Sequence, residues 1–418
     1  MTAAASSADE VIARIPAGAR VVVGQGTAEP LALTRALVCR RHDIGRVSVF
    51  LGAVFSDTFA PETTDGISFC GYGAIGAAGQ LARAGRLDIL AVPYSRIPET
   101  FGPDRPADAV LLQLSRSPRG LSFGLANDYT AVAARHARLV IAEVNAQAPW
   151  THGAEVGADL RIDHLVETDA PPCELAPARV SETEVRIGAE VAAVIADGAT
   201  IQTGIGALPD AVLAALSGHR DLGIHSGMIG DRAVDLIEAG AVTNARKEAD
   251  RGVTVTGVLF GTARLNHFAD RNAAVRVVDI ACSHGAASLS RLGRFTAVNS
   301  AIEVDLTGQV NAEVARGRYA GAVGGQPDFV RAALASPGGR SIIALPSTAG
   351  SGAVSRIVAS LSGPVTGPRC DADLVVTEWG VAALRGRTLA ERRRAMLAIA
   401  DPKFRDAIAR AAARVDVA

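Results

Sequence analysis

The sequence predicts an α/β protein with two related open-sheet domains, and three observations support this prediction. Short β-branched runs alternate with Ala- and Leu-rich stretches whose apolar residues have helical spacing. The chain has 43 glycines and 19 prolines, and they separate these segments at short intervals. A strand, a glycine turn and a helix near the start of the chain recur in the same order 180 residues further on.

The expected strands are β-branched runs apolar enough to lie inside a sheet. In chain order they are Arg20–Val23, Val47–Leu51, Ala109–Leu114, Leu139–Val144, Thr200–Thr203, Val253–Leu259, Ser341–Leu345 and Leu374–Thr377. The expected helices lie in the Ala- and Leu-rich stretches with helical spacing. They are Pro30–Cys39, Tyr129–Arg135, Glu182–Ala196, Pro209–Ala215, Arg232–Ala239, Phe329–Ala335 and Leu389–Ile399.

The repeat locates a domain boundary. The segment Gly18–Gly26 runs parallel to Gly198–Gly206, and each is followed by a proline and a helical stretch. Between the copies, Ala170–Ala178 contains three prolines and is suited to a linker. We therefore expect domains at 1–180 and 181–418.

Composition excludes several classes of protein. The 42 Lys and Arg nearly balance the 43 Asp and Glu, so no strong field attracts nucleic acid or an anionic membrane. Charged residues interrupt every apolar run before it could span a membrane, and Met1–Pro16 lacks the pattern of a secretory signal. The five cysteines are scattered, and the eight histidines form no metal-binding motif. We expect a cytoplasmic protein without a metal site.

Two glycine turns are candidate sites for an anion or a developing oxyanion. Gly204-Ile205-Gly206 ends an expected strand and precedes a helix, and Gly324-Gly325-Gln326 precedes another. Glycine lets backbone N–H groups approach a ligand oxygen, and a helix start favours negative charge. Neither turn has the spacing of a dinucleotide-binding or P-loop motif. A purely structural role for the first turn, and for the Gln326 amide, remains an alternative.

Between these turns, a glycine-punctuated strand end carries His225, Ser226 and Gly227. The carboxyl ends of strands in open α/β sheets are the usual place for ligands. This segment is therefore the predicted location of the chemistry.

At this point the motifs resemble those of the acetyl-CoA hydrolase/transferase family, class I CoA-transferases that include 4-hydroxybutyrate and acetate-type enzymes. In the first half they are Gly24-Gln25-Gly26-Thr27, Asp128-Tyr129-Thr130, Val140–Asn145 and Thr151-His152-Gly153. In the second half they are Gly204-Ile205-Gly206, Leu222–Ser226, Asn299–Asn311, Gly324-Gly325-Gln326 and Val376–Val381.

The resemblance implies two CoA-transferase-type domains with an active-site cleft between them, the second domain carrying the acyl-CoA site. It also implies a small acyl-CoA substrate, an acceptor, no permanently bound cofactor and a homodimer. In such enzymes a glutamate after a His-Ser or His-Thr pair attacks the acyl-CoA to give a mixed anhydride. The anhydride then becomes an enzyme-bound glutamyl-CoA thioester.

This chain departs from the family at that glutamate. The position falls on Gly227, which has no side chain to form an anhydride. Asp231 lies beyond another glycine, and Glu238 is assigned to the following helix. The usual route through a covalent glutamate is therefore not expected.

Three interpretations remain open. In the first, water or another acceptor attacks the thioester directly, with His225 orienting or deprotonating it. In the second, Ser226 forms an acyl-enzyme, although neighbouring residues of a strand point to opposite faces. In the third, the protein binds acyl-CoA without turnover.

Secondary candidates come from other family-like segments. Glu303 and Asp305 are alternative carboxylates, and Arg369 is a candidate partner for CoA phosphates. The run Cys282-Ser283-His284 lies where the family often carries Thr-His-Asp-Pro, and we interpret it as loop variation.

Overall fold

The computed structural model describes residues 7–413, and the chain divides into two compact units. Unit 1 comprises Met1–Ala176 and Val255–Ser283, and unit 2 comprises Pro177–Thr254 and His284–Ala418. This division differs from a single boundary near residue 180, because Val255–Ser283 packs within unit 1. There, the Leu259 amide donates to the Leu125 carbonyl at 2.8 Å.

Unit 1 contains an eight-stranded sheet whose main path is β4-β3-β2-β1-β5-β7-β8. Every neighbouring pair along this path is parallel, and β6 adds an antiparallel partner to β5. The strands are β1 (Arg20–Val23), β2 (Val47–Leu51), β3 (Ile67–Gly71), β4 (Leu87–Ile89), β5 (Ala109–Ser117), β6 (Gly120–Ser122), β7 (Leu139–Asn145) and β8 (His164–Thr168). The helices and 3-10 turns are α1 (Ala8–Ile12), η1 (Gly26–Ala28), α2 (Leu31–Cys39), α3 (Arg41–Ile44), η2 (Pro61–Thr63), α4 (Ala78–Arg83), η3 (Tyr94–Phe101) and α5 (Tyr129–His136).

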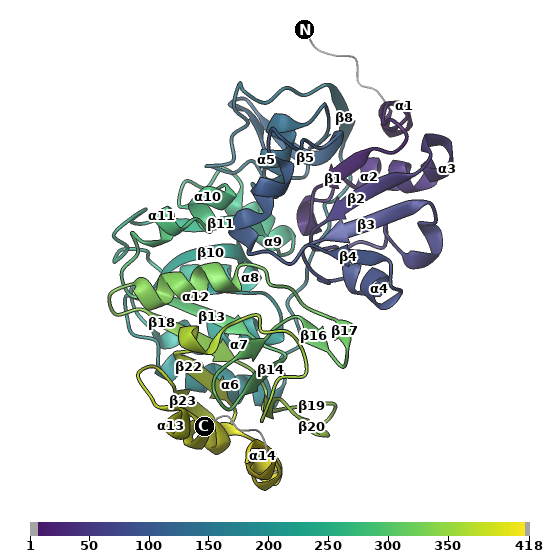
Figure 1. Ribbon diagram of the computed structural model, residues 1–418. Helices are drawn as coiled ribbons and strands as arrows, with labels where there is room; N and C mark the ends of the chain where they lie inside the picture. Colours follow the sequence, from purple (N-terminus) through teal and green to yellow (C-terminus); the bar gives the residue numbers. More distant parts are fainter. Residues whose placement is uncertain (1–6, 414–418) are drawn as a thin grey trace. The chain divides into compact units, whose positions relative to one another are not determined.

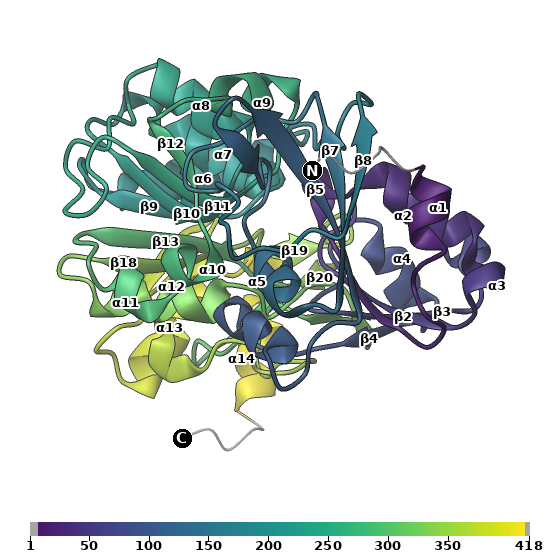
Figure 2. The same cartoon turned by 90° about the horizontal axis from the view of Figure 1, so that it is seen from above.

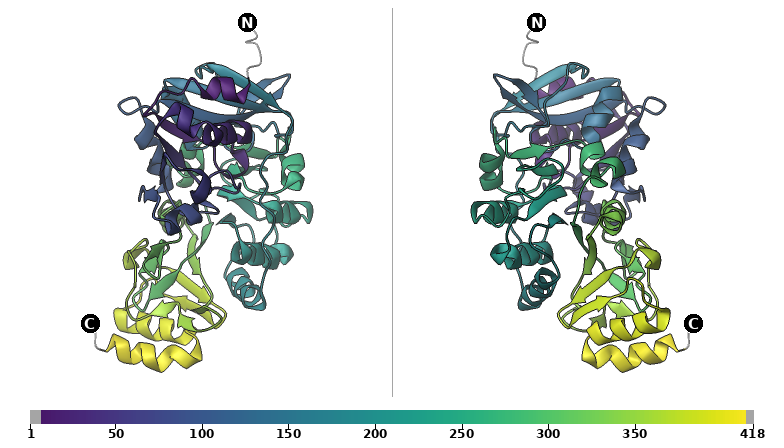
Figure 3. Two further views of the ribbon diagram at one scale, coloured as in Figure 1. Left: turned by 90° about the vertical axis from the view of Figure 1, so that its right-hand side faces the viewer. Right: turned by 90° about the vertical axis from the view of Figure 1, so that its left-hand side faces the viewer.

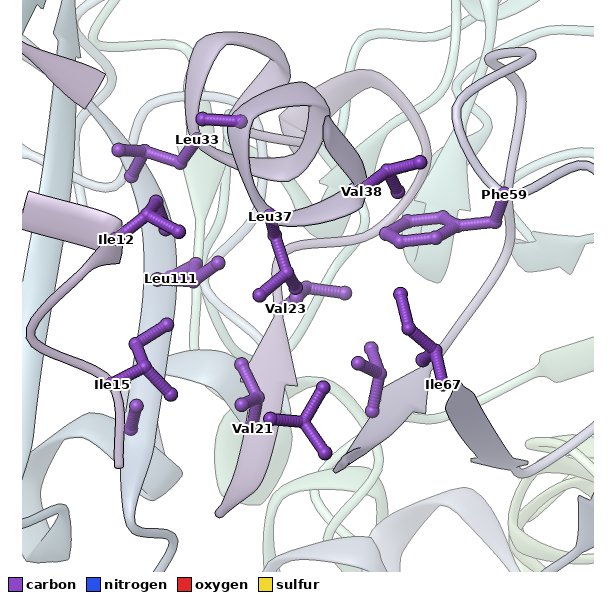
Figure 4. Close-up of a cluster of buried hydrophobic side chains, with 14 of the residues drawn as sticks. Ile12, Ile15, Val21, Val23, Leu33, Leu37, Val38, Phe59, Ile67 and Leu111 are labelled. Atoms are coloured by element: carbon purple, nitrogen blue, oxygen red, sulfur yellow. The ribbon is translucent and has the colours of Figure 1, made fainter. Parts of the chain in front are cut away.

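The two faces of this sheet have separate apolar contacts, as strand alternation requires. Val21 and Val23 of β1 share a core cluster with Leu37 of α2 (Figure 4). On β2, the ring of Phe50 instead meets Tyr129 of α5, with centroids 5.2 Å apart. Helices on both faces thus explain why the central strands are apolar throughout.

The chain returns to unit 1 with the segment Val255–Ser283, which contributes two strands and two helices. It contains most of β11 (Thr254–Leu259), α9 (Ala263–Ala269), β12 (Val275–Val277) and α10 (Ile280–Ser283). The Phe260 ring lies edge-on to Phe55, with centroids 4.9 Å apart. This segment therefore contributes to the packing of unit 1.

Six strands of unit 2 lie in the order β10-β9-β13-β18-β22-β23, parallel except for the last pair. They are β9 (Thr200–Thr203), β10 (Gly223–Ile229), β13 (Phe295–Ser300), β18 (Arg340–Ala344), β22 (Leu374–Thr377) and β23 (Gly380–Ala383). The main helices and 3-10 turns are α6 (Glu182–Ala193), α7 (Ala207–Ala215), η4 (Leu216–Gly218), α8 (Asp231–Glu238), α11 (Ala286–Leu289) and α12 (Gln326–Ala335). Figure 2 shows α6 and α7 on one face of these strands and α12 on the other.

The end of unit 2 adds small sheets and two helices. The short strands are β14 (Glu303–Asp305), β15 (Val310–Asn311), β16 (Val314–Ala315), β17 (Arg318–Tyr319), β19 (Thr348–Ala349), β20 (Val354–Ser355) and β21 (Ile357–Val358). They are followed by η5 (Arg369–Asp371), α13 (Leu389–Ile399), η6 (Pro402–Phe404) and α14 (Arg405–Ala412). The two yellow C-terminal helices pack against each other (Figures 1 and 3), with Met396 and Ile408 in one buried cluster.

The predicted α/β class is confirmed, and every predicted strand and helix has a counterpart. Ends differ by a few residues: α6 stops at Ala193 rather than Ala196, and α12 starts at Gln326 rather than Phe329. Within residues 7–413, no helix combines the length and apolarity needed to cross a membrane.

A buried glutamate in unit 1 leads to a prediction about pH. The Glu143 carboxylate accepts from the Ala32 and Leu33 amides at 2.8 and 3.4 Å, at the start of α2. Burial nevertheless raises the pKa of Glu143 to about 7. The native state therefore holds a proton that the unfolded chain loses near pH 4 to 5, so this stabilising contribution disappears as pH rises through 7.

We expect Glu143→Gln to remove that pH dependence. Glutamine keeps an acceptor for the Ala32 amide but carries no titrating group. Urea unfolding at pH 5 and pH 8 should show the variant gaining up to about 3 kcal/mol relative to the parent at the higher pH. The exposed Glu62→Gln variant is the control, and parallel pH profiles for the parent and Glu143→Gln would contradict this prediction.

Candidate active site in unit 2

The first glycine turn connects β9 to α7. Gly206 is the N-cap residue of α7 and has φ +109°, a conformation that favours glycine. No atom lies within 4 Å of a Cβ built on Gly206, whereas one on Gly204 would make an ordinary contact with Pro209. Gly206 is thus required by the backbone conformation, and the space beside the turn is open.

The next strand, β10, carries the predicted catalytic segment. His225 and Ser226 are each only 1% exposed. The Ser226 hydroxyl donates to the Thr203 carbonyl of β9 at 3.0 Å. This bond fixes Ser226 in the sheet and argues against a role as an acyl-enzyme nucleophile.

The space beside Gly227 is filled by the imidazole of His284. A Cβ built on Gly227 would lie 2.5 Å from His284 Nε2 and 2.6 Å from Cε1. A Cβ on Gly325 would lie 2.8 Å from both Cδ2 and Nε2 of the same ring. Real Cβ atoms do not come so close, so the absence of side chains at two glycines makes the room that the His284 ring occupies.

His284 is itself tightly packed. Its ring lies 4.7 Å from that of Phe329 on α12, centroid to centroid, and the residue is 4% exposed. Burial lowers the pKa of His284 to about 3, with the neighbouring His225 as a second cause. The imidazole is therefore neutral at physiological pH, and its displacement would disturb a packed core.

The second glycine turn brings Gly325 and Gln326 to the start of α12. Gln326 Nε2 donates to the Ser300 carbonyl at 3.1 Å. Its Oε1 is buried and has no hydrogen-bond partner within residues 7–413. Gln326 is 8% exposed and lines a narrow hollow with Val310 and Gly367. The adjoining Gly324 has φ +55°, so this turn also needs glycine.

The two alternative carboxylates are engaged in local structure. Glu303 accepts from Asn311 Nδ2 at 2.9 Å and from the Ser362 hydroxyl at 2.9 Å. Asp305 accepts from the Thr307 amide at 2.8 Å and from Gln309 Nε2 at 2.6 Å. Both residues therefore hold turns around β14.

Arg369 is exposed in η5, where its carbonyl accepts from Arg392 Nη1 at 2.6 Å. That contact involves the backbone of Arg369. A contact between the Arg369 guanidinium and the phosphates of CoA stays a prediction.

The structure thus corrects our interpretation of Cys282-Ser283-His284 as loop variation. Cys282 is exposed at the end of α10, whereas His284 packs against two predicted site glycines. A sequence signal was present, because the expected departures from the family pattern include both Gly227 and the run Cys282-Ser283-His284. The sequence alone does not show that Gly227 and His284 are in contact, and the signal can be interpreted only with that contact.

Comparisons with known proteins agree with the fold and with the family resemblance. Residues 261–412 match the acetyl-CoA hydrolase/transferase C-terminal domain. The 4-hydroxybutyrate coenzyme A transferase of Clostridium kluyveri is 38% identical over 413 residues, covering 96% of this chain and 95% of that protein.

Two solved structures show the same similarity. RipA from Yersinia pestis superposes with a TM-score of 0.91 at 31% identity, covering 99% of this chain and 97% of RipA. The 4-hydroxybutyrate CoA-transferase from Porphyromonas gingivalis has a TM-score of 0.82 at 35% identity, covering 98% and 97%. The chain belongs to the acetyl-CoA hydrolase/transferase family.

Proposed function

We propose that this protein processes a small acyl-CoA thioester without a glutamyl-CoA intermediate, by hydrolysis or by direct acyl transfer. Family membership supports the acyl-CoA substrate. The observation that carries the rest is the His284 ring, packed where a side chain at position 227 would have to lie. The segment His225-Ser226-Gly227 offers no carboxylate, and a side chain at position 227 would require the His284 ring to move.

The chemistry that fits these residues is direct attack. A water oxygen adds to the thioester carbonyl, the C–S bond breaks, and the water proton ends on the departing CoA thiolate. Backbone N–H groups at Gly204-Ile205-Gly206 and Gly324-Gly325 are candidates to stabilise the oxyanion. With a pKa of about 3, His284 is a weak proton acceptor, so we assign its neutral ring to orienting the nucleophile.

A conventional transfer through another carboxylate has less support. Glu303 and Asp305 each accept several hydrogen bonds from neighbouring residues. To act as a nucleophile, either would have to leave these partners. The structural role explains both residues more simply.

A second candidate function is acyl-CoA binding without turnover. The low exposure of His284 and His225 favours this function. Side chains that fill the catalytic space would prevent turnover while leaving the acyl-CoA-binding surface intact. For either function we further propose a homodimer in the cytoplasm, with no permanently bound cofactor.

The test is thiol release from short acyl-CoAs in buffer without any carboxylate. Hydrolysis predicts free CoA thiol and free acid in equal amounts, and direct transfer predicts an ester or amide when an alcohol or amine is supplied. We expect His284→Asn to lower kcat by about tenfold or more with little change in KM, because the acyl-CoA contacts remain. The exposed variant His42→Asn is the matched control.

Two outcomes would contradict the proposal. CoA that moves to a second carboxylate without free thiol would show conventional transfer. Saturable acyl-CoA binding with no product of any kind would instead establish the binding protein.

A further inference from the structure

Two short hairpins of unit 2 meet at their turns. Between β16 and β17 the chain turns at Arg316 and Gly317, and between β19 and β20 it turns at Gly350, Ser351 and Gly352. A Cβ built on Gly350 would lie 3.2 Å from Arg316 Nη2, so the tip of the first hairpin contacts the second. Both hairpins lie to the right of the main sheet of unit 2 in Figure 1. The thioester chemistry proposed above uses neither turn.

The β19–β20 turn presents unused backbone donors. Gly350, Ser351 and Gly352 have consecutive positive φ angles of 58°, 53° and 86°. The turn closes with the Ala353 amide donating to the Gly350 carbonyl at 3.1 Å, whereas the three preceding amides have no acceptor within residues 7–413. Successive backbone N–H groups in a turn of this kind form a concavity that binds anions. The turn is therefore suited to a ligand with several acceptor oxygens.

Cations from two different segments flank this turn. Arg316 lies beside Gly350 at one end, and Lys403 of η6 lies beside Gly352 at the other, where a built Cβ would be 3.1 Å from its Nζ. Neither side chain forms an ion pair in the described part of the chain. Lys403 Nζ instead lies 5.0 Å from the centroid of the Phe404 ring. Like charges held near one turn repel each other, so an anion bound there would relieve an unfavourable interaction.

The chain enters both hairpins from the edge of the sheet that carries the candidate active site. β13 leads through β14 and β15 to β16, and β18 leads directly to β19. β13 and β18 are parallel neighbours, and Ser300 pairs with Ala344 at their carboxyl ends. The Gly204-Ile205-Gly206 turn follows β9, the other parallel neighbour of β13. All three connections therefore start at one edge of the sheet, where ligands of open α/β sheets bind.

We propose that this turn, together with Arg316 and Lys403, binds a phosphate group. The phosphate oxygens accept from the turn amides, the guanidinium matches two oxygens at once, and the ammonium adds a point charge. A phosphate monoester carries a charge of about −1.5 to −2 near pH 7, which two cations balance. A carboxylate has one charge and two oxygens, so it would leave donors of this turn unused.

The phosphate has two sources, free inorganic phosphate or a phosphate of CoA, and amide NMR spectra of the full chain distinguish them. We expect inorganic phosphate to shift the amide resonances of Gly350, Ser351 and Gly352. If CoA shifts the same resonances, the occupant is a CoA phosphate, and dephospho-CoA then tells whether it is the 3′-phosphate. If CoA does not, the occupant is free phosphate. The CoA comparison rests on the proposed function, whereas the phosphate titration does not. No shift of these resonances with any of the three compounds at millimolar concentration would overturn the proposal.

Variants test the two cations. Arg316→Gln and Lys403→Gln should each weaken binding about threefold or more, and the double variant about tenfold or more, because each removes a charge-assisted contact. All three should keep the thermal midpoint of the parent, since both side chains are exposed. The matched control Arg340→Gln, exposed and without an ion pair within residues 7–413 at the amino end of β18, should bind like the parent. Unchanged binding in the double variant would overturn the proposal, whereas absence of thioester turnover alone would contradict only the proposed function.

Discussion

Gly227→Glu alone is expected to lose stability and to gain no CoA transfer, whereas Gly227→Glu combined with His284→Ala is expected to transfer CoA between carboxylates. In the single variant, Cβ would lie 2.5 Å from the His284 ring, which Phe329 and Gly325 hold in place. Such overpacking costs about 1–3 kcal/mol. The introduced glutamate side chain must then point away from the space in which its carboxylate would attack the thioester.

The double variant removes the obstruction. Alanine at 284 leaves a space shaped by Gly227, Gly325 and Phe329, and the new carboxylate can occupy it. Its oxygen attacks the acyl-CoA carbonyl, CoA leaves, and the CoA thiolate then attacks the glutamyl carbonyl as the acid departs. CoA stays bound to the protein as a thioester, so the mass of the protein increases by the mass of CoA minus that of one water.

Intact-protein mass spectrometry after incubation with acyl-CoA measures that adduct, and label exchange between acyl-CoA and a free carboxylate measures turnover. The exposed variant Gly218→Glu controls for an added charge, since nothing lies within 4 Å of its Cβ. Exchange by Gly227→Glu alone would show that the His284 ring moves freely. No adduct in a folded double variant would show that more than positions 227 and 284 prevents transferase chemistry in this site.

The local pattern predicts most of the α/β framework because strand alternation and helix spacing are local. Arg20–Val23 and Leu389–Ile399 have the predicted bounds. Of the missed strands, β8 carries a weaker pattern: it includes His164, Glu167 and Thr168 at the edge of its sheet, where burial is incomplete. Edge strands require less apolar surface, so their composition resembles that of loops.

Long-range contacts account for what the sequence could not predict. Val255–Ser283 begins within the expected strand Val253–Leu259 of the second half, yet it groups with unit 1. His284 is separated by 57 residues from Gly227, and no periodicity connects them. The glycine turns were predictable because Gly206 and Gly324 reflect a local requirement for positive φ.

Gln25→Leu is expected to produce the largest loss of stability in unit 1. Gln25 is 2% exposed, and its amide donates to Tyr94 Oη at 2.7 Å and Asp128 Oδ2 at 2.5 Å. Its carbonyl oxygen accepts from Tyr72 Oη at 2.7 Å and the Ala53 amide at 3.1 Å. Burial raises the pKa of both Tyr72 and Asp128, which shows how little water reaches this network.

Leucine matches the size of Gln25 but satisfies none of these four groups. Buried groups that lose their partners cost about 1–3 kcal/mol each, with partial relaxation, so we expect a loss of roughly 3–5 kcal/mol in urea unfolding. Hydrogen exchange at the Ala53 amide should accelerate because it loses its acceptor. The same substitution at the exposed Gln80 of α4 should change stability by less than about 0.5 kcal/mol. A comparably small loss for Gln25→Leu would mean that water or a rearranged tyrosine replaces the amide, and the network would then contribute little to the stability of unit 1.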